Sequence, residues 1–235
     1  MTRAKPRLVL FDIDGTLIRG NGAAKRAFEA SLVAAFGTAG DTTMPFDGKT
    51  DPQIARELMR GAGFDDAAID RRMGAVVAGY LERLREELAR GTGTFEALAG
   101  VGALLDALGA RDDVVLGLLT GNVVAGAEVK LRAAAIEWSR FRVGAYGNDS
   151  EYRPELPEIA RRRGEVVVGA PVAGSDVVVV GDTPADIACA RPIGARSVGV
   201  ASGRYGVDEL AEHDAAVVLP DLRDTGAAVA AVLGG

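Results

Sequence analysis

The chain has only one cysteine, Cys189, and therefore cannot form an intrachain disulfide. A reducing compartment suits such a chain, so we expect a cytoplasmic location. Cys189 is expected to be a small buried residue rather than a catalytic thiol. The single histidine, His213, lies near the C-terminus among acidic residues, and we expect it at the surface without a metal role.

Long apolar runs and an excess of positive charge are also missing. No uninterrupted apolar segment approaches the roughly 20 residues that cross a bilayer. The apolar stretch at residues 8–11 is too short for a signal peptide and ends at Asp12. A net charge of -6 disfavours binding to nucleic acid or to an anionic membrane, so we expect neither as a partner.

What is present is an alternation of strand and helix signals along the chain. Such alternation is typical of a doubly wound, mostly parallel sheet with helices on both faces, which is a Rossmann-like α/β core. Strands buried on both faces are short and apolar. Six segments fit this description: residues 8–11, 114–119, 141–146, 177–180, 197–200 and 215–219.

About 90 residues separate the first two of these strands and contain no convincing strand, which is too long for one crossover. Helical patterns fill the gap at residues 23–36, 52–62 and 65–89. We therefore expect a small α-helical cap domain at residues 20–92, inserted into a core domain of residues 1–19 and 93–235. Residues 91–93 would form the return hinge.

Two pairs of aspartates follow predicted strands. Asp12 and Asp14 come directly after the first strand, and two-residue spacing in extended chain directs both side chains to the same side. Ligands of doubly wound sheets bind at this end of the strands. Neighbouring carboxylates repel each other, and a hard divalent cation relieves that repulsion.

The second pair, Asp182 and Asp186, follows the fourth strand. A parallel sheet would bring Asp182 close to Asp12. For Asp186 a structural alternative stays open, because Thr183 and Asp186 also form a capping-box pattern at the start of a helix. Thr120, Gly121 and Asn122 end the second strand where another helix begins, a position suited to binding an anion.

These segments together resemble the haloacid dehalogenase-like (HAD) superfamily. The resemblance rests on DIDGT at residues 12–16, LLTGN at residues 118–122 and VVVVGDTPAD at residues 177–186. It covers nearly the whole chain, since the helical insertion after the first motif also agrees. The segment FDGKTDPQI, at residues 46–54, looks like the corresponding part of the phosphoglycolate phosphatase-like branch.

The resemblance implies a Mg²⁺-dependent phosphatase. Asp12 would attack phosphorus and form an aspartyl phosphate, and Asp14 would act as acid and then base. Dehalogenases of the superfamily lack an aspartate at the position of Asp14, so its presence favours phosphate chemistry. Mg²⁺ would be held by Asp12, the Asp14 backbone carbonyl and Asp182, with Asp186 as a further candidate. Thr120, Gly121, Asn122 and Thr16 are the candidates for binding phosphate.

The superfamily also uses a basic residue in its third motif, and two candidates stay open. Arg153 lies in the region where the lysine is usual, whereas Lys130 lies on the helix after Thr120; for each, an ordinary surface charge is the alternative. In the cap, Gly48, Lys49 and Thr50 resemble the substrate-specificity loop. Lys49 would meet a second anionic group or be a solvated lysine.

Three functions remain at this point. The first is hydrolysis of a small phosphate ester such as phosphoglycolate or a sugar phosphate, with nucleotides and pyridoxal-type phosphates still open. The second is a phosphomutase of the β-phosphoglucomutase type, which would return the phosphoryl group to substrate. The third is a non-catalytic phosphate-binding protein, because a fold alone does not establish an activity. We expect a monomer or a homodimer.

Overall fold

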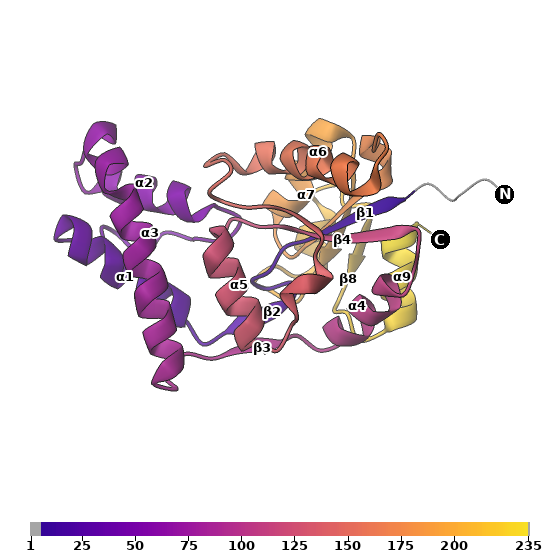
Figure 1. The fold of residues 1–235 in the computed structure, drawn as a ribbon, viewed down its shortest axis with the longest axis horizontal. Helices are drawn as coiled ribbons and strands as arrows, with labels where there is room; N and C mark the ends of the chain where they lie inside the picture. The colour runs from indigo at the N-terminus through magenta and orange to yellow at the C-terminus, as the bar shows by residue number, and fades with distance from the viewer. Residues whose placement is uncertain (1–5, 235) are drawn as a thin grey trace.

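The structure is a computed structural model and describes residues 6–234 of the chain. At its centre is a sheet in which all neighbouring strands run parallel (Figure 1). Across the sheet the strands follow in the order β5 (Val143–Ala145), β4 (Val114–Leu119), β1 (Arg7–Phe11), β6 (Val177–Gly181), β7 (Arg196–Val200) and β8 (Val217–Leu219). This arrangement confirms the predicted mostly parallel α/β core.

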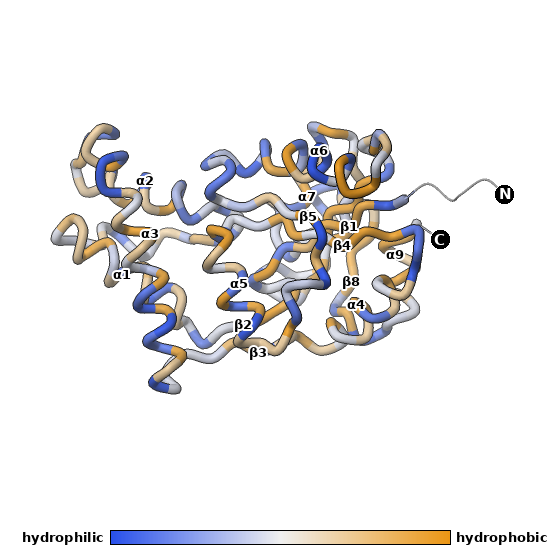
Figure 2. Tube along the Cα trace, viewed as in Figure 1, coloured by the Kyte–Doolittle hydropathy of each residue, from blue (hydrophilic) through white to orange (hydrophobic). Residues whose placement is uncertain are grey.

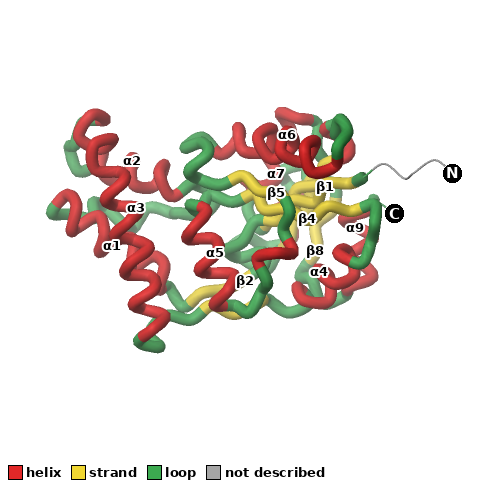
Figure 3. The backbone as a smooth tube through the Cα atoms, viewed as in Figure 1, coloured by secondary structure: helices red, strands yellow, loops and turns green. Residues whose placement is uncertain are grey.

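Helices cover both faces of the sheet (Figure 3). One apolar cluster joins alternate residues of β1, such as Val9 and Phe11, to helices α4 (Val101–Gly109), α5 (Val124–Ala133) and α9 (Thr225–Leu233). The other joins Leu8 and Leu10 to α6 (Leu156–Val168) and α7 (Pro184–Ala190). Apolar residues accordingly run along the strands (Figure 2). Because strand residues alternate between faces, a continuously apolar strand fills two cores.

Shorter elements complete the core. Helix α8 (Val207–Ala211) packs on β7 and β8. Single 3-10 turns form at Trp138–Arg140, Arg153–Glu155, Gly174–Asp176 and Arg191–Ile193. Cys189 is buried, as expected, and burial raises the pKa of its thiol to about 12. His213 is exposed. None of the helices in residues 6–234 combines the length and the hydropathy needed to cross a membrane.

The inserted residues form a helical lobe beside the sheet. Helix α1 (Ala23–Phe36) packs lengthwise against α3 (Asp66–Ala89), and α2 (Asp51–Gly61) packs against α3 (Figure 1). The three helices agree with the predicted ones to within one residue at each end. Side chains of Thr50 and Asp65 cap α2 and α3 by accepting hydrogen bonds from the backbone of the first turn. The proposed division into a core domain and a cap domain at residues 20 and 92 stays a prediction.

The expectation that no strand lies between the first two core strands is wrong. Strands β2 (Ile18–Gly20) and β3 (Phe95–Ala97) pair in an antiparallel ribbon, in which Ile18 faces Ala97. The ribbon holds together the two chain segments that enter and leave the helical lobe. Each strand has three residues, and its partner is more than 70 residues away in the sequence. Such short segments carry no period-two pattern, which explains why the sequence did not reveal them.

Candidate active site

A cavity of about 570 Å³ lies between the helical lobe and the carboxyl edge of the sheet. Core residues on one side include Asp12, Thr120 and Asp182, and residues 43–49 together with Asp51 line the other side. The register explains the convergence of the core residues. Phe11 of β1 pairs with Leu118 of β4 and with Val180 of β6, so all three strands end at the same level. The sequence therefore predicted correctly where polar residues would gather.

Three carboxylates meet at the base of this cavity. Asp12, Asp182 and Asp186 each offer an oxygen atom, and these atoms lie within 4.8 Å of one another. All three side chains are buried. Asp12 directly follows β1, Asp182 directly follows β6, and Asp186 lies in the first turn of α7. A set of hard oxygen donors of this kind fits a divalent cation such as Mg²⁺.

Asp186 forms the capping box and also belongs to the group of three carboxylates. One carboxylate oxygen, Oδ2, accepts hydrogen bonds from the backbone N–H of Thr183 at 3.0 Å and from its hydroxyl at 2.6 Å. The Thr183 hydroxyl oxygen in turn accepts from the Asp186 N–H. This capping box fixes one oxygen and directs the other, Oδ1, toward the guanidinium of Arg153 and the acidic group.

Arg153 is the positively charged partner of Asp12 and Asp186. Its guanidinium contacts the carboxylate of Asp186, and its Nη2 lies 3.2 Å from Oδ1 of Asp12. The side chain is buried, which excludes the alternative of an ordinary surface charge. Burial favours the neutral form of Arg153, yet attraction by Asp186 and Asp12 prevails and raises its pKa.

One guanidinium does not balance three carboxylates. Burial raises the pKa of Asp12 to about 7, and repulsion by Asp186 adds to the effect. Burial also raises the pKa of Asp182 to about 8, helped by repulsion from Asp186 and Asp12. Ionising all three carboxylates beside Arg153 leaves two negative charges without a counter-charge. A divalent cation at this group would supply the missing charge.

A second buried network surrounds Asp14. Its side chain is 45% exposed and reaches the cavity, while Oδ2 accepts hydrogen bonds from Lys130 Nζ at 2.7 Å and from Asn122 Nδ2 at 2.8 Å. Lys130 also donates to Asn122 Oδ1 at 2.6 Å. Burial acts to lower the pKa of Lys130, but attraction by Asp14, Tyr80 and Asp51 outweighs burial and raises it.

The two basic candidates therefore both line the cavity, at different carboxylates. Lys130 pairs with Asp14, whereas Arg153 pairs with Asp12 and Asp186. Lys130 is 5% exposed and, like Arg153, is not a surface charge. The sequence left Lys130 and Arg153 as alternatives for one basic position. In the structure both lie in the site, each beside a different carboxylate.

Thr120, Gly121 and Asn122 line the cavity as expected, but helix α5 begins only at Val124. The Thr120 hydroxyl oxygen accepts a hydrogen bond from Asn122 Nδ2 at 2.8 Å. The first amides of the helix already have acceptors, because Val123 N–H donates to Asp51 and Val124 N–H donates to Asn148 Oδ1. The anion-binding position expected at this helix start is therefore limited to residues 120–122.

Two of the expected phosphate- or substrate-binding residues do not line the cavity. The hydroxyl of Thr16 is fully buried and donates to Oδ1 of Asp182 at 2.9 Å, so it orients a carboxylate of the acidic group. Thr50 is also buried, and its hydroxyl donates to the backbone carbonyl of Glu151 at 2.8 Å. Gly48 and Lys49 line the cavity as expected. Lys49 has a partner, since its Nζ lies 2.5 Å from Glu57.

Sequence reasoning missed Asp51 and Tyr80. Asp51 starts α2 and lines the cavity, and its Oδ2 accepts a hydrogen bond from Val123 N–H at 2.9 Å. Burial raises the pKa of Asp51 to about 6, against the effect of Lys130. Tyr80, on α3, is 2% exposed and also lines the cavity. In the sequence, Asp51 precedes Pro52 and therefore resembles an ordinary helix start. Tyr80 is a single aromatic residue on a long helix, a pattern typical of core packing.

Comparison with known proteins gives a consistent picture. Residues 154–225 match the family model described as HAD-hydrolase-like. The chain is 29% identical to the probable phosphatase IndB of Dickeya dadantii over 237 residues, which covers 96% of this chain and 94% of that protein.

Solved structures share the whole fold. CbbY from Rhodobacter sphaeroides, solved in complex with phosphate, superposes with a TM-score of 0.69 at 21% identity, covering 94% of this chain and 96% of that chain. A protein described as a predicted phosphoglycolate phosphatase from Haemophilus somnus gives 0.65 at 18% identity, covering 95% and 98%. At these identities the likeness concerns the fold.

Proposed function

We propose that this chain is a haloacid dehalogenase-like hydrolase and a Mg²⁺-dependent phosphatase that hydrolyses a small phosphate monoester through an aspartyl phosphate on Asp12. The observation that carries this proposal is the buried group of Asp12, Asp182 and Asp186 beside a single guanidinium, at the base of a cavity. Three ionised carboxylates beside one guanidinium need further positive charge. The carboxylate of Asp12 also lines the cavity, where a ligand can reach it.

Asp12 is the proposed nucleophile. It is 7% exposed, lines the cavity and directly follows strand β1, which pairs with β4 on one side and β6 on the other. Its backbone N–H donates to the Val180 carbonyl at 2.9 Å, which helps to fix its position. A carboxylate oxygen would form a bond to phosphorus while the bond from phosphorus to the ester oxygen breaks. Water would then attack the phosphorus of the acyl phosphate and release inorganic phosphate, which restores the carboxylate.

Asp14 is the proposed acid and base. It is the exposed carboxyl of the site and faces the cavity, while Lys130 and Asn122 hold its Oδ2. In the first step it would give a proton to the departing alcohol oxygen, and in the second it would take one from the attacking water. The hydrogen bonds to Oδ2 leave Oδ1 to make this transfer.

The metal would be held by the carboxylates of Asp12, Asp182 and Asp186, with the Asp14 carbonyl as a further candidate from the family resemblance. When bound, Mg²⁺ supplies positive charge that lets an anionic nucleophile approach an anionic phosphate. Arg153 would add to this charge from the protein side. Its Nη2 lies 3.2 Å from Oδ1 of Asp12, so this charge stays next to the proposed nucleophile.

The remaining phosphate contacts would come from residues 120–122. Thr120 is fully buried, directly follows β4 and lines the cavity. Asn122 Nδ2 donates to both the Thr120 hydroxyl oxygen and Asp14 Oδ2 and so links the two residues. The backbone N–H groups of Thr120 and Asn122 already have acceptors, so the proposed donors are the Thr120 hydroxyl and the Gly121 N–H. Donors fixed in place stabilise charge on transferring oxygens without reorganising during the reaction. Cytoplasmic location and a monomeric or homodimeric state complete the proposal.

The test measures phosphate release from p-nitrophenyl phosphate and acetyl phosphate, with Mg²⁺ and with EDTA, for the wild type and for Asp12→Asn. We expect release that requires Mg²⁺ and that disappears in Asp12→Asn, because an amide is not an attacking anion. Release that survives this substitution would contradict the mechanism. A mutase would release little phosphate and would need a bisphosphate activator, and a binding protein would release none.

A further inference from the structure

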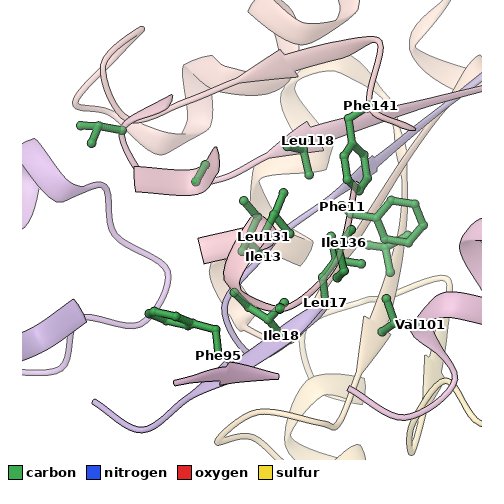
Figure 4. Packing of buried hydrophobic residues seen from close by; sticks show 14 of the residues in the cluster. Phe11, Ile13, Leu17, Ile18, Phe95, Val101, Leu118, Leu131, Ile136 and Phe141 are labelled. Atoms are coloured by element: carbon green, nitrogen blue, oxygen red, sulfur yellow. The ribbon is translucent and has the colours of Figure 1, made fainter. Parts of the chain in front are cut away.

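The half of the cavity formed by the helical lobe is unusually aromatic for this chain. Only 5% of the residues are aromatic, seven Phe, four Tyr and one Trp, yet four of them line this one cavity. They are Phe28 of α1, Phe46 of the loop before α2, Tyr80 of α3 and Phe95 of β3. Figure 4 shows Phe95 extending away from the residues packed around Phe11.

Three of these rings form a continuous wall. Phe28 meets Phe46 edge to face at 6.3 Å between ring centroids, and it meets Tyr80 in the same way at 5.5 Å. Phe28 and Tyr80 are almost fully buried, whereas Phe46 is half-buried and lies in the loop that borders the cavity. Met44 and Ile54 line the same side. An apolar wall gains free energy when a ligand covers it.

The cations on this side are already paired. Lys49 Nζ lies 2.5 Å from Glu57, and this hydrogen bond helps to hold the pKa of Glu57 low against the opposing effect of burial. Arg204 lies 3.3 Å from Asp47. A second anionic group on the substrate would therefore compete with Glu57 for Lys49 and with Asp47 for Arg204.

Two further cations at the rim have other partners. Lys25 Nζ donates to the Thr42 carbonyl and lies 5.0 Å from the centre of the Phe46 ring, and Arg19 donates to the Ser202 carbonyl. Lys25 also lies 3.8 Å from Glu29, whereas the carbonyl partner of Arg19 carries no charge. Both cations attract a phosphate dianion toward the entrance.

The volume of the cavity also favours a substrate larger than phosphoglycolate. A volume of about 570 Å³ is typical of pockets that enclose a ligand far larger than a two-carbon acid with its phosphate. Phosphate at Asp12 would leave most of the aromatic half unfilled. An alcohol with a flat ring fills it.

We infer that the substrate is a phosphate monoester whose alcohol carries a flat, uncharged ring of about the size of a nucleoside base or a pyridine, with Phe46 as a specificity-determining residue. This inference rests on the proposed function, and it selects among the phosphate esters that the sequence left open. The ring lies against the wall of Phe28, Phe46 and Tyr80 while the phosphate reaches Asp12.

The first experiment compares kcat/KM for uridine 5′-monophosphate, pyridoxal 5′-phosphate, glucose 6-phosphate and 2-phosphoglycolate in Mg²⁺. We expect at least one of the two planar-ring esters to exceed both other esters by about tenfold or more, the scale on which an apolar pocket discriminates. The two ring esters distinguish a nucleoside from a pyridine alcohol. A value for 2-phosphoglycolate or glucose 6-phosphate that equals the better ring ester overturns the inference.

The second experiment uses Phe46→Leu, with Phe36→Leu as a matched control. Phe36 is also a half-buried ring of the helical lobe, but it packs on Phe64 and does not line the cavity. We expect Phe46→Leu to lower the preference for the ring ester over acetyl phosphate about fivefold, mainly through a higher KM, while Phe36→Leu keeps the wild-type preference. An unchanged preference in Phe46→Leu, or an equal loss in both variants, contradicts the inference.

Failure of the inference and failure of the proposed function give different results. Mg²⁺-dependent release from p-nitrophenyl phosphate, 2-phosphoglycolate and glucose 6-phosphate without a preference for the nucleoside or pyridine esters would overturn the inference and leave the phosphatase proposal intact. Absence of release from every ester, with Asp12→Asn indistinguishable from the wild type, would overturn both.

Discussion

The ammonium group of Lys130 lies 2.7 Å from Oδ2 of Asp14, although 116 residues separate them in the sequence. Asn122 contacts both partners, and so the three side chains form one closed network. Lys130 is 5% exposed and Asp14 is half-exposed. The buried cation therefore fixes the proposed acid and base from below, while the other side of the carboxyl faces the cavity.

Replacing Lys130 by methionine tests this relationship. Lys130→Met keeps the length of the side chain but leaves Asp14 without its cation and Asn122 Oδ1 without a donor. We expect kcat for p-nitrophenyl phosphate to fall by about 100-fold, since positioned proton transfer contributes on this order or more. Arg132→Met is the control, because Arg132 lies on the same helix but is exposed and pairs only with Glu128. A drop of similar size in Arg132→Met would refute the specific role of Lys130.

Asp51 connects the helical lobe to the start of α5. Its backbone N–H donates to the Gly121 carbonyl at 2.8 Å, and its carboxylate accepts from Val123 N–H at 2.9 Å. We expect Asp51→Ala to lower the free energy of unfolding by about 1–3 kcal/mol, because the Val123 N–H loses its acceptor in a buried place. Urea unfolding followed by circular dichroism measures this loss.

The matched variant is Asp51→Asn. The side-chain amide oxygen still accepts the Val123 hydrogen bond, so we expect it to restore most of the stability that Asp51→Ala loses. Because the pKa of Asp51 is raised to about 6, the carboxyl is mostly ionised at pH 7.5, and the neutral amide removes a negative charge near Lys130. Equal stability losses in both variants would show that the hydrogen bond is not what Asp51 provides.

The sequence predicted the core strands and the acidic residues because both signals are local. Runs such as residues 177–180 are apolar throughout, which only a strand covered on two faces explains. Asp12 and Asp182 follow such runs directly, and parallel strands bring their ends together. The positions of these residues therefore followed from chain order alone.

The partners of these residues were not predictable in the same way. Arg153 and Lys130 were weighed as alternatives because a charged residue carries no local sign of burial, and only the packing of α5 and α7 places each beside its carboxylate. Thr16 and Thr50 were assigned to ligand binding because their motifs face the site, whereas their hydroxyls bond to Asp182 and Glu151. The direction of a side chain depends on tertiary packing, which the motif does not encode.

Binding of Mg²⁺ should stabilise the protein more at high pH than at low pH. The pKa of Asp182 is raised from 3.8 to about 8, so the folded protein binds more protons than the unfolded chain between about pH 4 and pH 8. Stability from this group is therefore fully present below pH 4 and is lost as the pH rises through 8. Mg²⁺ replaces these protons, and we expect its shift of the melting temperature to be larger at pH 8 than at pH 5.

Asp182→Asn serves as the comparison for that measurement. The amide does not titrate, so the variant should lose less stability than the wild type between pH 5 and pH 8 in EDTA. It should also gain less from Mg²⁺, because one carboxylate ligand is missing. Thermal melts at both pH values, with EDTA and with Mg²⁺, give all four comparisons. A Mg²⁺ shift that is the same at pH 5 and pH 8 would contradict the role of the carboxylates.

Removal of Arg153 should make the fold depend on Mg²⁺. Arg153→Met leaves Asp12, Asp182 and Asp186 without any cation of the protein, and loss of one partner of a buried ion pair typically costs about 3–5 kcal/mol. We expect a large fall in melting temperature in EDTA at pH 8, a smaller fall at pH 5 where the carboxyls take up protons, and partial recovery with Mg²⁺. Arg90→Met, which removes an exposed pair with Glu86, should change stability by less than about 1 kcal/mol in every condition. If Arg153→Met melts like the wild type in EDTA at pH 8, the guanidinium does not balance the carboxylates, and the argument for a divalent cation loses its electrostatic basis.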